Sequence, residues 1–148
     1  MTGPDELRTM APAPDLVAAT ACATAAAVAA RVDIHEVDRP AELAGIADLY
    51  DEIWRPNTNP LVSPELLRAL NKAGNYVAAA FDDGQLVGAC VGFFTAPVYS
   101  ALHSHIAGVS ATVLGRHVGY ALKLHQRAWA LRHEVRLVEW TFDPLVAR

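Results

Sequence analysis

Residues 109–122, Val-Ser-Ala-Thr-Val-Leu-Gly-Arg-His-Val-Gly-Tyr-Ala-Leu, contain the turn on which the fold prediction depends. An apolar run ends here, a loop with Gly115 follows, and a long helix begins near Val118. A helix N-terminus offers unpaired backbone N–H groups and the positive end of the helix dipole, which together suit phosphate or pyrophosphate. Arg116 adds a forked cationic donor to the same turn. The stretch therefore predicts an anion site, although glycine in such a turn also serves tight packing alone.

Hydrophobic periodicity predicts regular elements on both sides of this turn. Apolar residues at three- and four-residue spacing indicate helices, and short apolar or alternating runs indicate strands. The expected helices cover about 16–30, 40–54, 64–73 and 118–133, and the expected strands 32–37, 76–81, 86–94, 101–113 and 135–142. This order predicts the α/β class with a mixed α+β sheet, in which the last strand–helix–strand unit is a right-handed parallel crossover.

Local signals define the ends of several elements. Asp38 is expected to cap the helix that begins at Pro40, since a proline in the first turn lacks only an N–H that has no partner there. Ser63 marks the start of the next helix, and Asp83-Gly84 between two apolar runs predicts a tight hairpin. On the last helix we expect Ala121, Leu124, Ala128 and Leu131 to face inward, and Lys123, Gln126, Arg127 and His133 to face outward.

From residue 32 onward, the element order and residues 109–122 resemble the GNAT superfamily of acyl-CoA N-acyltransferases. The acyl-CoA loop of that family reads Val-x-Pro-x-x-(Gln/Arg)-Gly-x-Gly-x-(Gly/Ala), and Gly115, Arg116, Val118 and Gly119 match it. Residues 140–145, Trp-Thr-Phe-Asp-Pro-Leu, also look like a signature of a poorly characterised GNAT subgroup. The resemblance implies a GNAT-like fold and transfer of an acetyl group from acetyl-CoA to an amine.

The same resemblance implies which residues bind the cosubstrate. Backbone groups at Ala107 and Val109 would hydrogen-bond the pantetheine arm of acetyl-CoA. The residues implied to wrap its pyrophosphate are Gly115, Arg116, His117, Val118, Gly119 and Tyr120.

Three positions depart from the family pattern. Ala111 stands in place of a proline, Leu114 in place of Gln or Arg, and His117 in place of a glycine. A side chain at position 117 either crowds the ligand or forces an unfavourable φ, because only glycine adopts positive φ without steric cost. Alternatively, the His117 imidazole contacts phosphate itself.

Three residues are candidate proton acceptors for the acceptor amine. His105 lies on the strand that faces the site in GNAT proteins, and an imidazole titrates in the useful range. Glu139 and Asp143 flank the end of the last strand, although Asp143 before Pro144 also fits a simple turn cap. The family's chemistry is direct attack of the amine on the thioester, so positioning and oxyanion stabilisation replace a covalent intermediate.

A full GNAT domain continues beyond the Trp140 strand with a helix and a hairpin, whereas this sequence stops at Arg148. We therefore expect a leader plus alanine-rich helix over 1–31 and a GNAT-like domain over 32–148 that is truncated at its C-terminus. The strand at 135–142 would keep an open apolar edge, which favours homo-oligomers. Two hypotheses follow: an N-acetyltransferase acting on a small-molecule or peptide amine, or an inactive truncated module that associates through this edge.

Composition excludes several other classes. The net charge of −4 argues against a nucleic-acid partner. The alanine-rich stretch at 16–30 falls short of the roughly 20 apolar residues that cross a membrane, so it is expected to pack on the domain. Neither the histidines nor Cys22 and Cys90 show metal-ligand spacing, and the free cysteines fit a reducing, cytoplasmic location without a metal.

Overall fold

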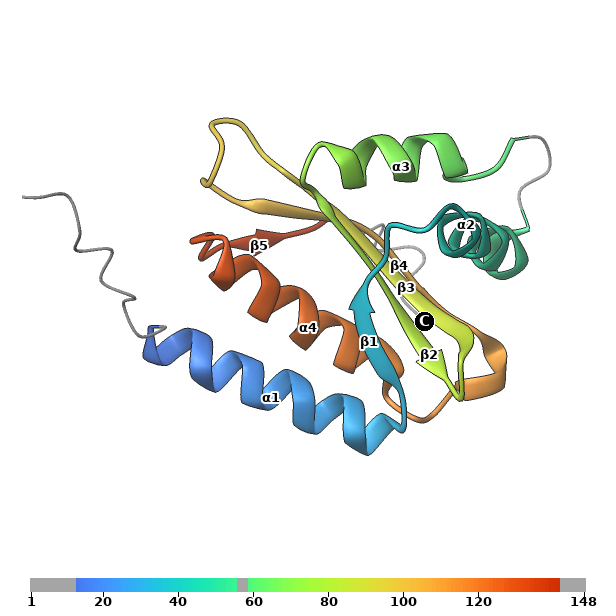
Figure 1. Ribbon diagram of the computed structural model, residues 1–148, viewed down its shortest axis with the longest axis horizontal. Coiled ribbons are helices and arrows are strands. Elements are labelled where there is room, and N and C mark those ends of the chain that lie inside the picture. Colours follow the sequence, from blue (N-terminus) through green and yellow to red (C-terminus); the bar gives the residue numbers. More distant parts are fainter. Residues whose placement is uncertain (1–12, 56–58, 142–148) are drawn as a thin grey trace, which may run out of the picture.

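The computed structural model describes residues 13–55 and 59–141. Five strands form one mixed sheet in the order β1-β2-β3-β4-β5, with all neighbours antiparallel except β4 and β5 (Figure 1). The elements in chain order are α1 (Pro14–Ala30), β1 (Asp33–Glu36), α2 (Pro40–Trp54), α3 (Pro64–Lys72), β2 (Tyr76–Asp82), β3 (Gln85–Phe94), β4 (Leu102–Val109), the 3-10 turn η1 (Ala111–Val113), α4 (Val118–Arg132) and β5 (Val138–Glu139). The predicted α+β class with a mixed sheet is confirmed.

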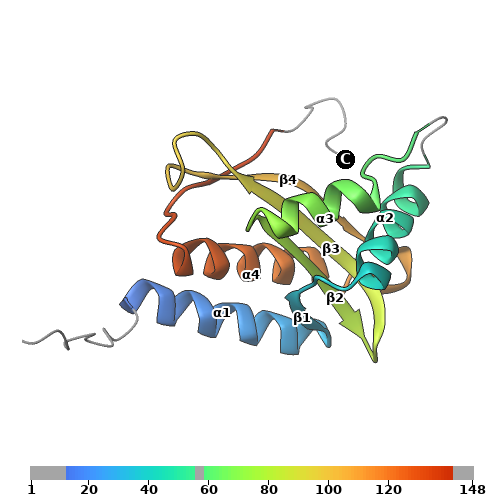
Figure 2. The same ribbon diagram turned by 45° about the horizontal axis from the view of Figure 1, so that its top comes forward.

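Helices cover both faces of the sheet, α4 on one face and α2 with α3 on the other (Figure 2). The alternation of side chains along β2 serves both layers, since Tyr76 and Ala78 join the α4-side core while Val77 and Ala79 join the α2-side core. Trp129 of α4 is 1% exposed and is the largest buried side chain. Trp129 is not among the residues that the periodicity of this helix predicts to face inward.

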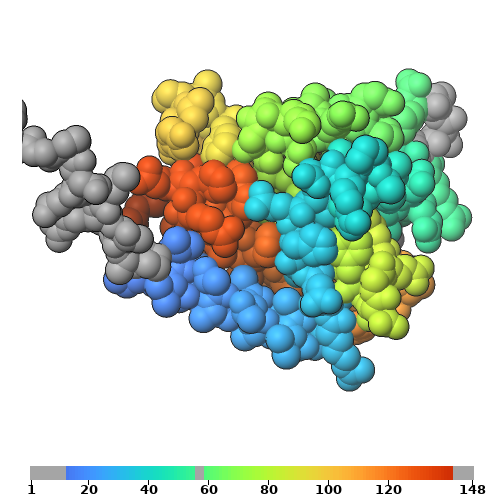
Figure 3. Space-filling view, in the orientation of Figure 1, coloured from blue at the N-terminus to red at the C-terminus, as the bar shows by residue number. Residues whose placement is uncertain are grey.

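The alanine-rich helix α1 lies along the outer side of α4, as Figures 1 and 3 show. Ala19 and Ala23 of α1 pack on Ala128 of α4, with Leu124 and Leu131 beside them. Their short side chains let the two helices approach closely. Packing on the domain is thus confirmed for α1, while residues 1–12 of the expected leader lie outside the described residues. Within the described chain, no helix is both long and apolar enough to span a bilayer.

One turn prediction and one helix-start prediction are confirmed, and one cap prediction is wrong. Asp83 (φ 49°) and Gly84 (φ 80°) adopt the paired positive φ values of a tight hairpin between β2 and β3. Ser63 caps α3, because its Oγ accepts a hydrogen bond from the Leu66 N–H. At α2, however, the N-cap is Arg39 and no side chain caps the helix, so Asp38 does not play that part.

Two predicted strands are shorter than expected. The run at 101–113 leaves the sheet after Val109, because Ser110 accepts a hydrogen bond from the Thr112 N–H and starts the turn η1. The run at 135–142 forms a strand only at Val138–Glu139 among its described residues. Val135 instead turns into the core at 1% exposure and donates its N–H to the Ala130 carbonyl, which ends α4.

Candidate functional site

Strand β5 pairs with only part of one edge of strand β4. The two strands pair in parallel at Leu102↔Val138 and His103↔Glu139. From Ser104 to Val109, no described strand pairs with this side, and we call residues 104–109 the open edge of β4. The Ser110 N–H donates to the Val87 carbonyl of β3 at 2.8 Å. Because backbone groups alternate in direction along a strand, those of Ala107 and Val109 point to the open edge.

A β-bulge interrupts β4 at one end of this edge. Val91 of β3 pairs with Ile106, but the next residue, Gly92, pairs with Ser104, so His105 has no partner in the ladder. Bulges bend a strand and redirect its side chains. The exposed His105 ring lies 5.7 Å from the Phe93 ring, centroid to centroid. Sequence reasoning did not find this bulge, since it is a property of the pairing register.

The loop before α4 lies at the other end of the open edge. His117 is the N-cap of α4 at φ 62°, which is the unfavourable conformation expected of a residue in place of glycine. Among the described residues no side chain caps this helix, and the first intrahelical bond runs from the Ala121 N–H to the His117 carbonyl. The N–H groups of Val118, Gly119 and Tyr120 therefore have no intrahelical acceptor. A Cβ on Gly119 would lie 3.7 Å from Val109 Cγ2, so these free N–H groups adjoin β4.

The Arg116 side chain points away from this loop and binds the end of α1. Its guanidinium donates to the Ala30 carbonyl at 2.9 and 3.1 Å and to the Arg31 carbonyl at 2.8 Å. It also pairs with Asp82 at 2.6 Å, and this hydrogen bond lowers the pKa of the Asp82 carboxyl. Carbonyls at a helix C-terminus lack intrahelical donors, which explains the arrangement. The forked donor that the sequence suggested for an anion is thus engaged elsewhere.

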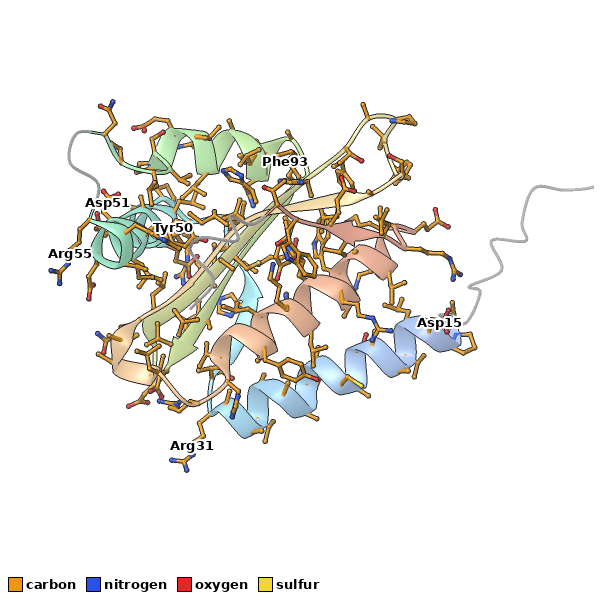
Figure 4. The ribbon with its side chains drawn as sticks, turned by 180° about the vertical axis from the view of Figure 1, so that it is seen from behind. Asp15, Arg31, Tyr50, Asp51, Arg55 and Phe93 are labelled. Carbon is orange, nitrogen blue, oxygen red and sulfur yellow. The ribbon has the colours of Figure 1, made fainter. Side chains whose placement is uncertain are left out.

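A cavity of about 410 Å³ opens beside the loop and the C-terminal end of α2. Arg55 is among the residues that line it, and Figure 4 shows Arg55 at the end of α2 near Tyr50 and Asp51. The residues that line the cavity are Glu52, Ile53, Arg55, Val109, Ala111 and Leu114. Ala111 and Leu114 are two positions that depart from the family pattern, and Arg55 was not among the residues predicted from the sequence.

A partly buried cluster of side chains lies where β4 and β5 separate. Lys123 of α4 donates a hydrogen bond to Ser104 Oγ, lies 3.5 Å from Gln126 Oε1, and stands over the Trp140 ring at 5.2 Å from its centroid. Gln126 is 0% exposed, which corrects its predicted outward position, and its Nε2 has no hydrogen-bond partner among the described residues. Ser104 is 4% exposed. We call Ser104, Lys123, Gln126 and Trp140 the vertex cluster.

The two described candidate catalytic residues follow or precede members of the vertex cluster in the chain, on two different strands. His105 is the bulged residue of β4, and Glu139 is the last residue of β5, paired in the ladder with His103. Both side chains are exposed. Asp143 lies outside the described residues. Within the described ranges, no group of three or more His, Cys, Asp or Glu side chains is placed to hold a metal ion.

No protein-family model matches the chain, and no curated protein sequence is significantly similar to it. Solved structures do match. An aminoglycoside acetyltransferase from an uncultured soil metagenomic sample, in complex with sisomicin, superposes with a TM-score of 0.70 at 15% identity over 79% of this chain and 81% of the other. An N-acetyltransferase from Staphylococcus aureus Mu50 gives 0.65 at 13% identity over 78% and 76%.

A GNAT family acetyltransferase from Brucella melitensis, in complex with acetyl-CoA, gives a TM-score of 0.61 at 19% identity over 76% of each chain. These superpositions agree with the element order and with the partial pairing of β4 and β5. The chain therefore has the fold of the GNAT acyltransferases.

Proposed function

We propose that this protein is an N-acetyltransferase that moves an acetyl group from acetyl-CoA to an amine by direct attack. The observation that carries the proposal is the open edge of β4, which leads directly to free N–H groups at the start of α4. Likeness to acetyltransferases, one of them in complex with acetyl-CoA, supports the same function. The acceptor amine is a small molecule or a peptide.

Acetyl-CoA would bind along the open edge. Its pyrophosphate would accept hydrogen bonds from backbone N–H groups over 115–120, where the helix dipole is favourable. The amides of its pantetheine arm would pair with the outward backbone groups of Ala107 and Val109, as an added strand does. In this proposal Arg116 contributes through its backbone position alone, because its guanidinium is held by α1 and Asp82. The exposed His117 side chain either contacts phosphate or narrows the entrance.

Transfer needs a neutral amine beside the thioester carbonyl. The amine nitrogen bonds to the carbonyl carbon, negative charge develops on the carbonyl oxygen, and the carbon–sulfur bond then breaks. His105 and Glu139 are the described candidates for taking the amine proton, directly or through water, and Asp143 is a third from outside the described residues. Positioning along the open edge supplies much of the catalytic effect.

Isothermal titration with acetyl-CoA tests the proposal. We expect binding by the wild type and its loss in Gly119→Val, because two methyl groups would enter the space next to the free N–H groups. Gly45→Val is the matched control: Gly45 is a helical glycine in α2, where a Cβ meets only Leu86 Cδ1 at 3.5 Å. Absence of wild-type binding at millimolar acetyl-CoA would refute the proposed function. Equal binding by Gly119→Val would refute the assignment of the loop.

A second candidate function is association with another chain through the outer edge of β5. Leu137 is 53% exposed and Trp140 is 59% exposed, so two large apolar side chains flank this strand on the surface. An unpaired strand edge is a template for pairing with a further strand. In this alternative the protein is catalytically inactive.

A further inference from the structure

We propose that Lys123 binds and stabilises the coenzyme A thiolate that leaves during transfer. This inference rests on the proposed function and names a catalytic residue for it. Lys123 lies on α4, half-buried, and its ammonium faces Ser104 and Trp140 rather than solvent alone.

The position of Lys123 along the open edge carries the argument. Ser104 is the first residue of β4 beyond its last pair with β5, and Trp140 is the first residue beyond β5. Lys123 contacts both, so its ammonium stands at the point where the two strands separate. From the free N–H groups near Val109 back to Ser104, the edge measures about 15 Å at the usual rise per strand residue. An extended pantetheine arm spans a similar distance, which brings its sulfur to Lys123.

The surroundings of Lys123 are built to hold a cation. Gln126 Oε1 and Ser104 Oγ turn acceptors toward the ammonium, and the Trp140 ring adds a cation–π contact. Within the described residues no carboxylate pairs with Lys123. Among the described residues, its positive charge is therefore balanced only by dipoles. Gln126 Nε2, which is buried and unpartnered, is a second donor at the same place.

The described tyrosines and the neighbouring cysteine do not compete with Lys123 for this role. Tyr50 donates to the Ile106 carbonyl on the α2 side of the sheet, and Tyr76 is hydrogen-bonded to His125. Tyr99 and Tyr120 lie on the surface at 60% and 63% exposure. Cys90 Sγ lies 4.0 Å from Ser104 Oγ, but burial raises the pKa of that thiol, so it stays uncharged beside the cluster.

The step balances without a further reactant. As the new carbon–nitrogen bond forms and the carbon–sulfur bond breaks, the thiolate keeps the bonding electron pair and remains ion-paired with the Lys123 ammonium. The proton of the attacking amine passes to the base, Lys123 keeps its charge throughout, and the released thiolate takes a proton from solvent. A nearby cation lowers the pKa of a thiol, so this contact stabilises the leaving thiolate.

The test uses coenzyme A alone, so it does not need the acceptor amine. The ultraviolet absorbance of the thiolate is followed against pH for coenzyme A bound to the wild type. We expect the bound thiol to titrate about one pH unit or more below free coenzyme A. In Lys123→Met the bound thiol should titrate at or above the free value, and in Lys123→Arg the lowering should largely persist, because the cation is kept.

Lys72→Met is the matched control, since Lys72 in the last turn of α3 belongs to the other face of the sheet. Desulfo-coenzyme A provides a second measurement. For the wild type, the affinity for coenzyme A relative to the desulfo compound should increase as pH rises. The total increase should be about tenfold for each unit by which binding lowers the pKa of the thiol. Lys123→Met should abolish this increase.

The outcomes separate the two proposals. If the wild type binds no coenzyme A, the proposed function fails. If it binds coenzyme A but the bound thiol titrates like the free thiol, the role of Lys123 is refuted and the proposed function stands. An equal lowering of the thiol pKa in wild type and Lys123→Met also refutes the role of Lys123. Should Lys123→Met not fold, the wild-type titration and the Lys123→Arg comparison decide.

Discussion

Arg116 illustrates how one side chain can be diverted from a predicted ligand to a structural contact. Its guanidinium joins the last carbonyls of α1 to Asp82 at the hairpin that ends β2, and it is only 30% exposed. We expect Arg116→Met to lower the free energy of unfolding by about 1–2 kcal/mol, because it removes hydrogen bonds from a charged donor to carbonyls. This value is reduced because the side chain is partly exposed to water. Urea denaturation measures this loss.

The control for this prediction is Arg136→Met. Arg136 also reaches α1, where it pairs with Asp15 at 3.4 Å, but the two side chains are 77% and 64% exposed. An ion pair so open to water contributes little, about 0.5 kcal/mol or less. Equal effects of the two substitutions would contradict the structural role assigned to Arg116.

We expect His125 to make the free energy of unfolding depend on pH. Its Nδ1 lies 2.8 Å from the hydroxyl of the fully buried Tyr76, and burial lowers the pKa of the imidazole. In the unfolded chain the imidazole has its ordinary pKa near 6.5, whereas in the folded protein it takes up a proton only at lower pH. The free energy of unfolding should therefore fall as pH decreases from about 6.5 toward the lowered folded pKa, and this contribution should level off below it.

Denaturation curves of the wild type and His125→Gln across this pH range measure the effect. Other titrating groups are present in both proteins, so the difference between the two curves isolates His125. We expect that difference to change within the window and to stay constant above it. A difference that does not vary with pH would overturn the prediction.

At the scale of elements, Gly108 sets how closely α2 packs on β4. A Cβ at this position would lie 2.8 Å from Ile53 Cδ1 and 3.0 Å from the Trp54 ring, both in the last turns of α2. Gly108→Ala should therefore push the end of α2 outward and cost about 1–3 kcal/mol of stability. Thermal and urea denaturation give the magnitude.

Gly45→Ala provides the opposite expectation within the same helix. A Cβ there meets Leu86 Cδ1 at an ordinary 3.5 Å, and alanine is favoured over glycine inside a helix by about 1 kcal/mol. We expect a small gain in stability. If Gly108→Ala were equally harmless, the close contact between β4 and α2 would not be a constraint on the fold.

At the scale of the whole molecule, the outer edge of β5 is the surface at which a second chain would pair. The strand is short, and the exposed Leu137 lies directly before it. We expect the protein to self-associate at micromolar concentrations and Leu137→Lys to weaken that association, because a charge on an edge strand opposes pairing. Light scattering over a concentration series measures both. A monomeric wild type throughout the series would contradict this expectation.

Much of the architecture was predictable because it depends on local patterns. The hairpin at Asp83-Gly84, the Ser63 cap and the helix that starts at Val118 follow from the conformational preferences of those residues and their neighbours. The loop at 115–119 was also visible, since glycines and a helix start are adjacent in the chain. What failed was the length of the strands at 101–113 and 135–142, where apolar composition continues after the ladder has ended.

The sequence by itself determined the order of the elements and the position of the loop before α4, because side-chain periodicity and turn preferences act over a few residues. Only the tertiary structure decided that His105 is bulged, that the Arg116 guanidinium binds α1 and that Gln126 is buried beside Lys123. A hydropathy pattern assigns every polar side chain to solvent. It does not contain the strand register. It also does not show where polar groups gain partners from different elements in a gap between two strands.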